Sequence, residues 1–69
     1  MKPYIVRMIE DQKYLEDKIT KGRRAVNDES IDMTEYERLL LSKQMSFYEQ
    51  ALATLILRIK IAKEKEGED

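Results

Sequence analysis

The sequence contains neither cysteine nor histidine among its 69 residues. Without cysteine there is no disulfide, no thiolate nucleophile and no thiolate metal ligand. Without histidine, the commonest general base and the commonest metal ligand are both missing. Ser42 and Ser46 have no evident base beside them. Asp28, Glu29 and Asp32 lack the glycine-centred spacing of a calcium loop. We therefore expect no enzyme activity, no cofactor and no metal site.

Long apolar runs are also missing. Near the C-terminus the longest uninterrupted run is Leu55-Ile56-Leu57, whereas a membrane-spanning helix needs about 20 apolar residues. The opening Met1-Lys2-Pro3 leads directly into a charged amphipathic segment, which is unlike a signal peptide. These features predict a cytoplasmic protein without a membrane partner.

Neither sign of charge dominates. There are 13 Lys and Arg against 14 Asp and Glu, for a net charge of −1. Binding to duplex nucleic acid requires a cationic face, so we exclude that function. Residues 1–27 carry a net charge of +3 and residues 28–69 a net charge of −4. This asymmetry fits two solvated faces that attract each other weakly, or a basic pocket for a small anion.

What the sequence does contain is apolar periodicity at helical spacing. A helix is predicted over about residues 3–26, with Pro3 in its first turn, and a second over about 34–63. Residues 27–33 between them are polar and read as a loop, and the acidic tail 64–69 should fray. Thr34 followed by Glu37 is a capping box that starts the second helix. The first seam is Ile5, Met8, Gln12, Leu15, Ile19, Gly22 and Val26.

These elements predict an all-α fold, a two-helix antiparallel hairpin with coiled-coil-like seams in one domain over 1–69. A short turn would place Gln12 level with Tyr48, so the second helix would overshoot the first. Ile59 and Ile61 would then need another subunit. So short a chain buries little apolar area alone, which also favours a homo-oligomeric helical bundle. We expect the oligomer interface along Leu41, Met45, Tyr48, Leu52, Leu55 and Ile59, flanked by a second stripe of Leu40, Phe47, Ala51 and Ile61.

A further pattern opens with Tyr4 and Arg7-Met8-Ile9 and closes with Arg58-Ile59. Between them lie Leu15, Lys18-Ile19, Leu40-Leu41, Gln44 and Leu55. With this pattern the chain resembles, over nearly its whole length, a family of small and mostly uncharacterised proteins encoded by bacteriophages and prophages. Members of that family end in LL-x2-Q-x3-M-x2-Y-x3-L-x2-R-I. Here Tyr48 replaces the family Met, and Ala51 replaces the family Tyr.

The size and shape are also similar to the helical-hairpin sponges with which phages sequester the cyclic nucleotide signals of the CBASS and Thoeris defences. This second likeness is one of architecture, and no residue role is carried over from it. Together the two resemblances imply a phage protein that acts in the host cytoplasm.

Five residues are candidates for binding a small anionic nucleotide. Tyr4, Arg7 and Arg58 should gather near the open end of the hairpin, where guanidinium groups match phosphate and a tyrosine face stacks on a base. Arg58 would otherwise extend to solvent or pair with an acidic residue of a neighbouring subunit. Lys21, Arg23 and Arg24 form a second basic cluster, and the alternative interpretation is that they are cations placed favourably at a helix C-terminus.

Three functions follow. The first is a phage-encoded oligomer that sequesters a nucleotide-type immune signal without catalysis. The second is a protein–protein interaction module, in which the apolar face of the second helix inhibits or regulates a host or phage protein. The third is a structural coiled-coil element without a ligand.

Overall fold

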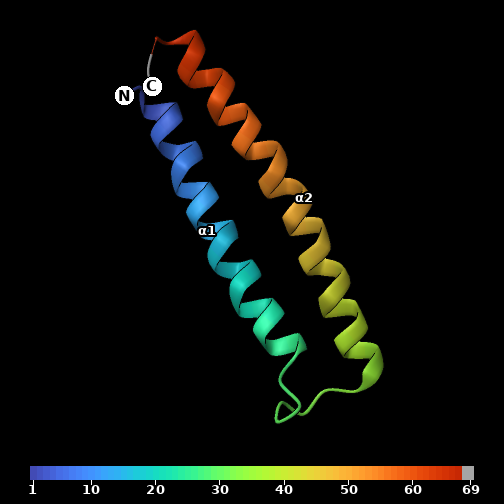
Figure 1. Ribbon diagram of the computed structural model, residues 1–69. Coiled ribbons are helices and arrows are strands. Elements are labelled where there is room, and N and C mark those ends of the chain that lie inside the picture. The colour runs from blue at the N-terminus through green and yellow to red at the C-terminus, as the bar shows by residue number, and fades with distance from the viewer. Residues whose placement is uncertain (68–69) are drawn as a thin grey trace.

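The computed structural model describes residues 1–67 and consists of two helices, α1 (Pro3–Val26) and α2 (Glu35–Lys65). The helices run antiparallel along each other, so that both chain ends lie at the same end of the hairpin (Figure 1). No strand is present in the part of the chain that the structure describes. The prediction of an all-α fold with two packed helices is therefore confirmed. No helix within residues 1–67 is long and apolar enough to cross a membrane.

The helix boundaries follow local sequence signals. α1 begins at the expected Pro3, where a missing N–H costs nothing. At the start of α2, the Glu37 N–H donates to Thr34 Oγ1 over 3.0 Å, and the Thr34 N–H donates to the Glu37 carboxylate over 3.1 Å. The predicted capping box is thus present. α2 continues to Lys65, beyond the expected end near 63, so part of the expected frayed tail is helical. Residues 68–69 of that tail lie outside the described residues.

One arginine ties the loop to both helices. The Arg38 guanidinium, from the first turns of α2, donates to the backbone carbonyls of Ala25 and Val26 at 3.2 and 2.8 Å. It also donates to the carbonyls of Asp28 and Ile31, each over 3.1 Å. The last carbonyls of a helix have no partner within the helix, so a cation satisfies them and complements the helix dipole. Arg38 thereby fixes how the chain leaves α1.

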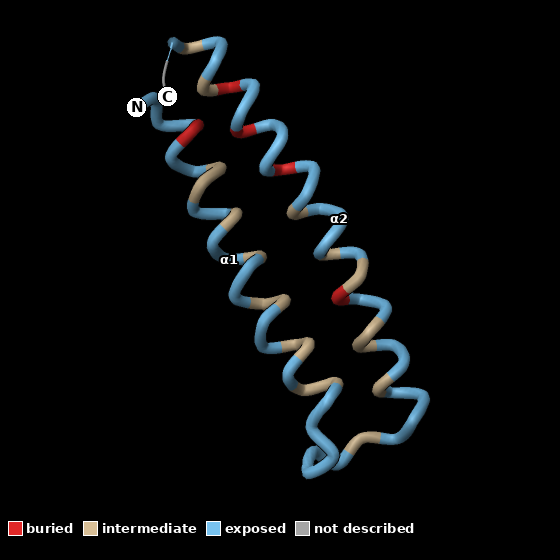
Figure 2. Tube along the Cα trace, viewed as in Figure 1, coloured by how far each residue is buried: buried red, intermediate tan, exposed pale blue. Residues whose placement is uncertain are grey.

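The core is thin and uneven. Ile5 from α1 is fully buried, and four residues of α2 are buried with it or along the same seam. Figure 2 shows that burial is concentrated in the half of the hairpin that holds the chain ends. Toward the loop, the helices are held by one buried side chain, Met45, and by polar contacts. The buried residues are Ile5, Met45, Leu55, Ile59 and Ala62.

The register of the two helices differs from the prediction. Gly22 lies against Met45, because a Cβ added at Gly22 would overlap the Met45 side chain. The expected register would have placed Gly22 beside Arg38, seven positions earlier, or about two helical turns. The loop folds back on itself under Arg38 instead of making a short turn, so it does not set the register. At the open end α2 therefore does not overshoot α1 as predicted, and Ile59 is buried within the chain.

The seam that we assigned to an oligomer interface packs within the hairpin. Its members are all buried or half-buried, and Met45, Leu55 and Ile59 are buried. Within one hairpin these three side chains are therefore not exposed to a second subunit. For Ile59 the cause is the shifted register, which gives the end of α2 a partner on α1. The six residues are Leu41, Met45, Tyr48, Leu52, Leu55 and Ile59.

Candidate functional site

A pocket lies between the two helices at the end that holds the termini. It has a volume of about 270 Å³. α1 contributes Tyr4 and Met8, which are spaced one turn apart and therefore share a face of the helix. From the last turns of α2, the lining residues are Arg58, Ile61, Ala62 and Lys65. The pocket thus has an apolar floor with an aromatic ring and two cations at its rim.

The cations of this terminal pocket are exposed. Arg58 and Lys65 form no ion pair with any of the described residues. The Tyr4 hydroxyl donates to a carboxylate oxygen of Glu66 over 3.4 Å, which places an acidic group at the same rim. A guanidinium group offers a planar fork of donors for phosphate oxygens, and an ammonium group offers a mobile point charge. The pocket can therefore bind an anion that also carries an apolar or planar part.

Two of the three residues predicted at the open end meet in this pocket. Tyr4 and Arg58 both line it, as expected from their positions at the open ends of the helices. Arg7 is exposed one turn along α1 from Tyr4, but it is not among the lining residues. Lys65 was not predicted, because the expected helix ended before it. Its signal was present in the charged tail, which continues the helical spacing from Arg58.

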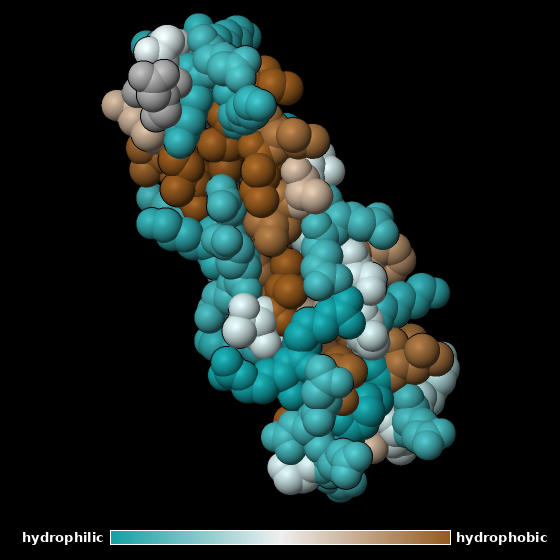
Figure 3. Space-filling model, viewed as in Figure 1, coloured by the Kyte–Doolittle hydropathy of each residue, from teal (hydrophilic) through white to brown (hydrophobic). Residues whose placement is uncertain are grey.

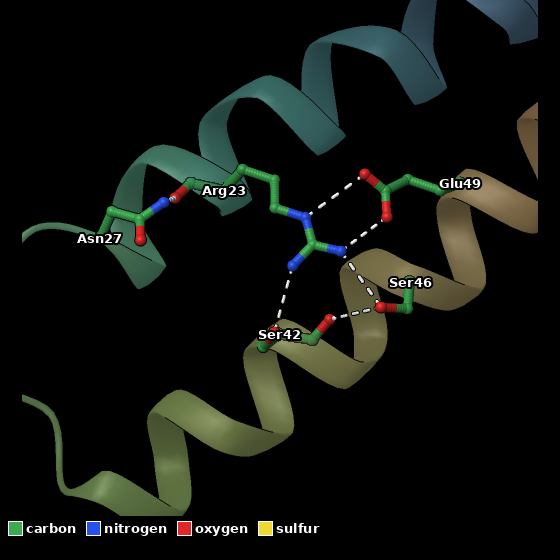
Figure 4. Close-up of polar contacts among 5 residues, drawn as sticks. All are labelled: Arg23, Asn27, Ser42, Ser46 and Glu49. Carbon is green, nitrogen blue, oxygen red and sulfur yellow. Dashed lines mark hydrogen bonds and ion pairs between the residues drawn. The ribbon is translucent and has the colours of Figure 1, made fainter.

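Arg23, a predicted ligand-binding residue, forms a polar cluster with residues of α2. Its guanidinium reaches across to α2, where it donates to both carboxylate oxygens of Glu49, at 2.6 and 3.3 Å (Figure 4). It also donates to the hydroxyls of Ser42 and Ser46, each over 3.1 Å. With its donors engaged in this cluster, Arg23 is not available to an anion. Arg24, its neighbour, is exposed and does not join the cluster.

The Arg23 cluster and two loop contacts make folding sensitive to acid. Hydrogen bonds from Arg23 lower the pKa of Glu49 below its ordinary value. The backbone N–H of Thr34 lowers the pKa of Glu37, and the hydroxyl of Ser30 lowers that of Asp28. A carboxyl with a lowered folded pKa stabilises fully above its unfolded pKa, which is about 4, and this stabilisation is lost as pH falls through the folded value.

We therefore expect the thermal midpoint to be flat near neutral pH and to fall below about pH 4. Circular dichroism melts across that range measure it. Glu49→Gln should make the acid-induced fall shallower, because one of the three linked protons is gone. Glu16→Gln is the matched control, because Glu16 is exposed on α1 and lies outside the Arg23 cluster. Equal profiles for the two variants would contradict the role of the Arg23 cluster.

Lys18 forms a second contact that the sequence did not reveal. Its ammonium group donates a hydrogen bond to the Tyr14 hydroxyl over 3.2 Å. It also lies over two aromatic rings, 5.1 Å from the centroid of Tyr14 and 5.8 Å from that of Tyr48. Rings attract cations through their negative faces. The hydrogen bond with Tyr14 raises the pKa of Lys18. This contact bridges α1 and α2 midway along the hairpin.

Much apolar surface remains uncovered. Figure 3 shows apolar side chains gathered on one face, over the half of the hairpin that holds the termini. Val6, Ile56 and Leu57, all in that half, stay exposed. A separate stripe runs along α2 beside the buried seam, and we call it the lateral stripe. It consists of exposed residues at helical spacing: Leu40, Phe47, Ala51, Thr54, Arg58 and Ile61.

Comparisons of the chain with known protein families, with characterised proteins and with solved structures find no match.

Proposed function

We propose that this chain is a small, non-catalytic binding protein that takes an anionic ligand of nucleotide type in the terminal pocket. The supporting observation is that Tyr4, Arg58 and Lys65 meet over an apolar floor. Arg58 binds the phosphate group of the ligand, since its planar guanidinium group can donate two hydrogen bonds to phosphate oxygens. Tyr4 offers a ring on which a base can stack.

The size of the pocket limits what one hairpin holds. Ligand pockets commonly measure about 300–1,000 Å³. At about 270 Å³ the terminal pocket is at or below this range, so it accommodates a phosphate and part of a base or ribose. The rest of a dinucleotide would extend out of the pocket. A cyclic di- or trinucleotide would thus be bound partly in the pocket and partly on the neighbouring surface.

The biological role that we propose is sequestration. A phage protein of this kind would hold a nucleotide immune signal in the host cytoplasm and keep it from its receptor. This requires affinity and abundance but no chemistry. The resemblance of the sequence to the phage family motivates this role, and the pocket offers a place for the ligand.

Native mass spectrometry with a panel of cyclic di- and trinucleotides and cyclic ADP-ribose isomers tests the proposal. We expect discrete ligand additions, followed by calorimetry on the ligand that binds. Arg58→Gln should weaken that ligand by about 10- to 100-fold, because a hydrogen bond to a charged group contributes about 1.5–3 kcal/mol. Arg24→Gln removes an equal charge from an exposed position away from the pocket and should leave affinity within about twofold.

Two results would count against nucleotide binding. One is that no member of the panel adds to the protein. The other is an equal loss for Arg58→Gln and Arg24→Gln, since this would indicate general charge attraction in place of a site. Circular dichroism of both variants checks that neither substitution changes the fold.

The exposed apolar residues of α2 favour a second candidate, a protein–protein interaction module. Leu39, Phe47 and Leu57 are 63%, 58% and 61% exposed. An amphipathic helix with such residues fits an apolar groove on a partner protein. In that case, affinity purification from infected cells should recover one partner at fixed stoichiometry, and Phe47→Ser should abolish the capture while Arg58→Gln leaves it intact.

A further inference from the structure

The hairpin exposes more surface than a compact protein of its mass. Its accessible surface is 5393 Å² for a chain of 8.2 kDa. A compact monomer of that mass would expose roughly 4,500 Å² by the usual scaling with mass. The excess is thus about 900 Å², which is close to the roughly 800 Å² that each partner buries in a standard interface.

The lateral stripe is the surface best suited to cover this excess. It runs nearly the full length of α2, whereas the exposed Val6 and Ile56 belong to one half of the hairpin only. Leu40, Phe47 and Ile61 supply its large apolar groups, at 47%, 58% and 64% exposure. Ala51, near its middle, is exposed and small. A small residue allows two helices to approach closely at that point.

The face of α2 that contains the lateral stripe is also complementary to itself. Gln44 and Arg58 each lie seven positions from Ala51, and Glu37 and Lys65 each lie fourteen positions from it. A step of seven residues returns a helix to nearly the same face, so these residues share one line with Ala51. When two copies of α2 are laid antiparallel about Ala51, Glu37 of each meets Lys65 of the other. Gln44 in the same way meets Arg58.

A second row of stripe residues is also placed symmetrically about Ala51. Leu40 and Ile61 lie at almost equal distances on either side of Ala51, and Phe47 and Thr54 lie closer in. The antiparallel arrangement therefore sets apolar Leu40 of one copy against apolar Ile61 of the other. It also sets the ring of Phe47 against the small Thr54. Self-complementarity of this kind is what a two-fold symmetric interface requires.

We propose that a second copy of this chain docks on the lateral stripe, with α2 antiparallel to α2 and the two-fold axis beside Ala51. The product is a four-helix dimer in which each hairpin keeps its own buried seam. The dimer itself does not depend on the proposed function. The part of the inference that concerns the ligand rests on that function and deepens it.

The dimer would complete the terminal pocket. Arg58 and Ile61 line the pocket and also belong to the stripe, so the second copy would lie directly beside the opening. Gln44 of the second copy would then offer an amide next to the phosphate-binding Arg58. The small volume of the pocket in one hairpin is thereby explained, because one wall comes from the partner.

Cysteine cross-linking tests the interface directly, because the chain has no native cysteine. Ala51→Cys places a thiol on the proposed axis. Ala53→Cys is the matched control, because two residues turn a helix by about 200°, to the opposite side of α2. Under mild oxidation we expect Ala51→Cys to run as a disulfide-linked dimer on a denaturing gel and Ala53→Cys to stay monomeric.

A charge placed at the same two positions gives an independent test. In equilibrium sedimentation we expect the unmodified chain and Ala53→Glu to be dimers, at twice 8.2 kDa. Ala51→Glu should be a monomer with unchanged helical circular dichroism, since Ala51 is exposed within one hairpin. A monomeric unmodified chain, or cross-linking at position 53 in preference to 51, would overturn the inference.

Ligand measurements separate this inference from the proposed function. A dimer that cross-links at position 51 but takes up no cyclic nucleotide supports the interface and removes the nucleotide function. Uptake by the monomeric Ala51→Glu variant with undiminished affinity would overturn the completed pocket and leave nucleotide binding standing. Loss of both dimer and uptake in Ala51→Glu supports the shared site.

Discussion

Replacing Met45 with alanine is expected to lower the free energy of unfolding by about 3 kcal/mol, the usual size for truncating a buried Met or Leu. Met45 is 3% exposed and is the one buried side chain in the loop half of the hairpin. Its side chain extends over Gly22 of α1, where no Cβ separates the two helices. Removing it would leave a cavity that the half-buried residues around it can fill only in part.

The same contact predicts a reversal of sign at Gly22. A Cβ built there would lie 2.7 Å from Met45 Cε and closer still to its sulfur. Gly22→Ala alone should therefore be destabilising, although alanine raises helix propensity by about 1 kcal/mol over glycine. In the Met45→Ala background the space is vacant, so Gly22→Ala should restore about 1 kcal/mol. A double-mutant cycle isolates this coupling.

Urea unfolding followed by circular dichroism measures all four proteins, at one protein concentration because a dimer's stability depends on it. Leu57→Ala is the matched control, since Leu57 is apolar, on the same helix and 61% exposed. It should cost less than about 0.5 kcal/mol. If Gly22→Ala were stabilising in both backgrounds, Met45 would not occupy the space above Gly22.

The helices and their contact faces could be predicted from the sequence because these features depend on local spacing. The steps of three and four residues place Ile5, Leu55 and Ile59 on facing seams, and Thr34 with Glu37 specifies where α2 begins. The register could not be predicted in this way. A seam with a seven-residue repeat fits its partner almost equally well when shifted by one repeat, and the shift found here is of that size.

In the candidate site, too, some features could be predicted from the sequence and others depended on the register. Tyr4 and Arg58 were expected together because both lie at the open end, and a shift of one repeat leaves them there. The contacts of Arg23 could not be predicted, because Ser42, Ser46 and Glu49 lie far along the chain and only the register brings them to it. Arg58 lies within an otherwise apolar stretch of the sequence, and in the structure it lines the pocket.

Replacing Arg38 with alanine is expected to cost about 2 kcal/mol, because hydrogen bonds from a charged group each contribute up to about 1.5–3 kcal/mol and these lie partly in water. Arg38 donates to four carbonyls, two in the last turn of α1 and two in the loop. No other residue among 1–67 shows such a set of donor contacts to the backbone. Lysine keeps the charge but cannot form the planar fork, so Arg38→Lys should recover less than half of the loss.

The loss at Arg38 should be localised, which distinguishes it from general destabilisation. The amides of Asn27 and Asp28 bond to the carbonyls of Arg23 and Ala25, at the end of α1 that Arg38 holds. Hydrogen exchange at these two amides should quicken in Arg38→Ala by more than exchange near Leu55 does. Arg24→Ala, the matched control, removes a nearby exposed arginine and should leave both rates unchanged. Unchanged protection of Asn27 and Asp28 would contradict this role of Arg38. The loop would then be stabilised by its own turns, such as the one between Asp28 and Ser30.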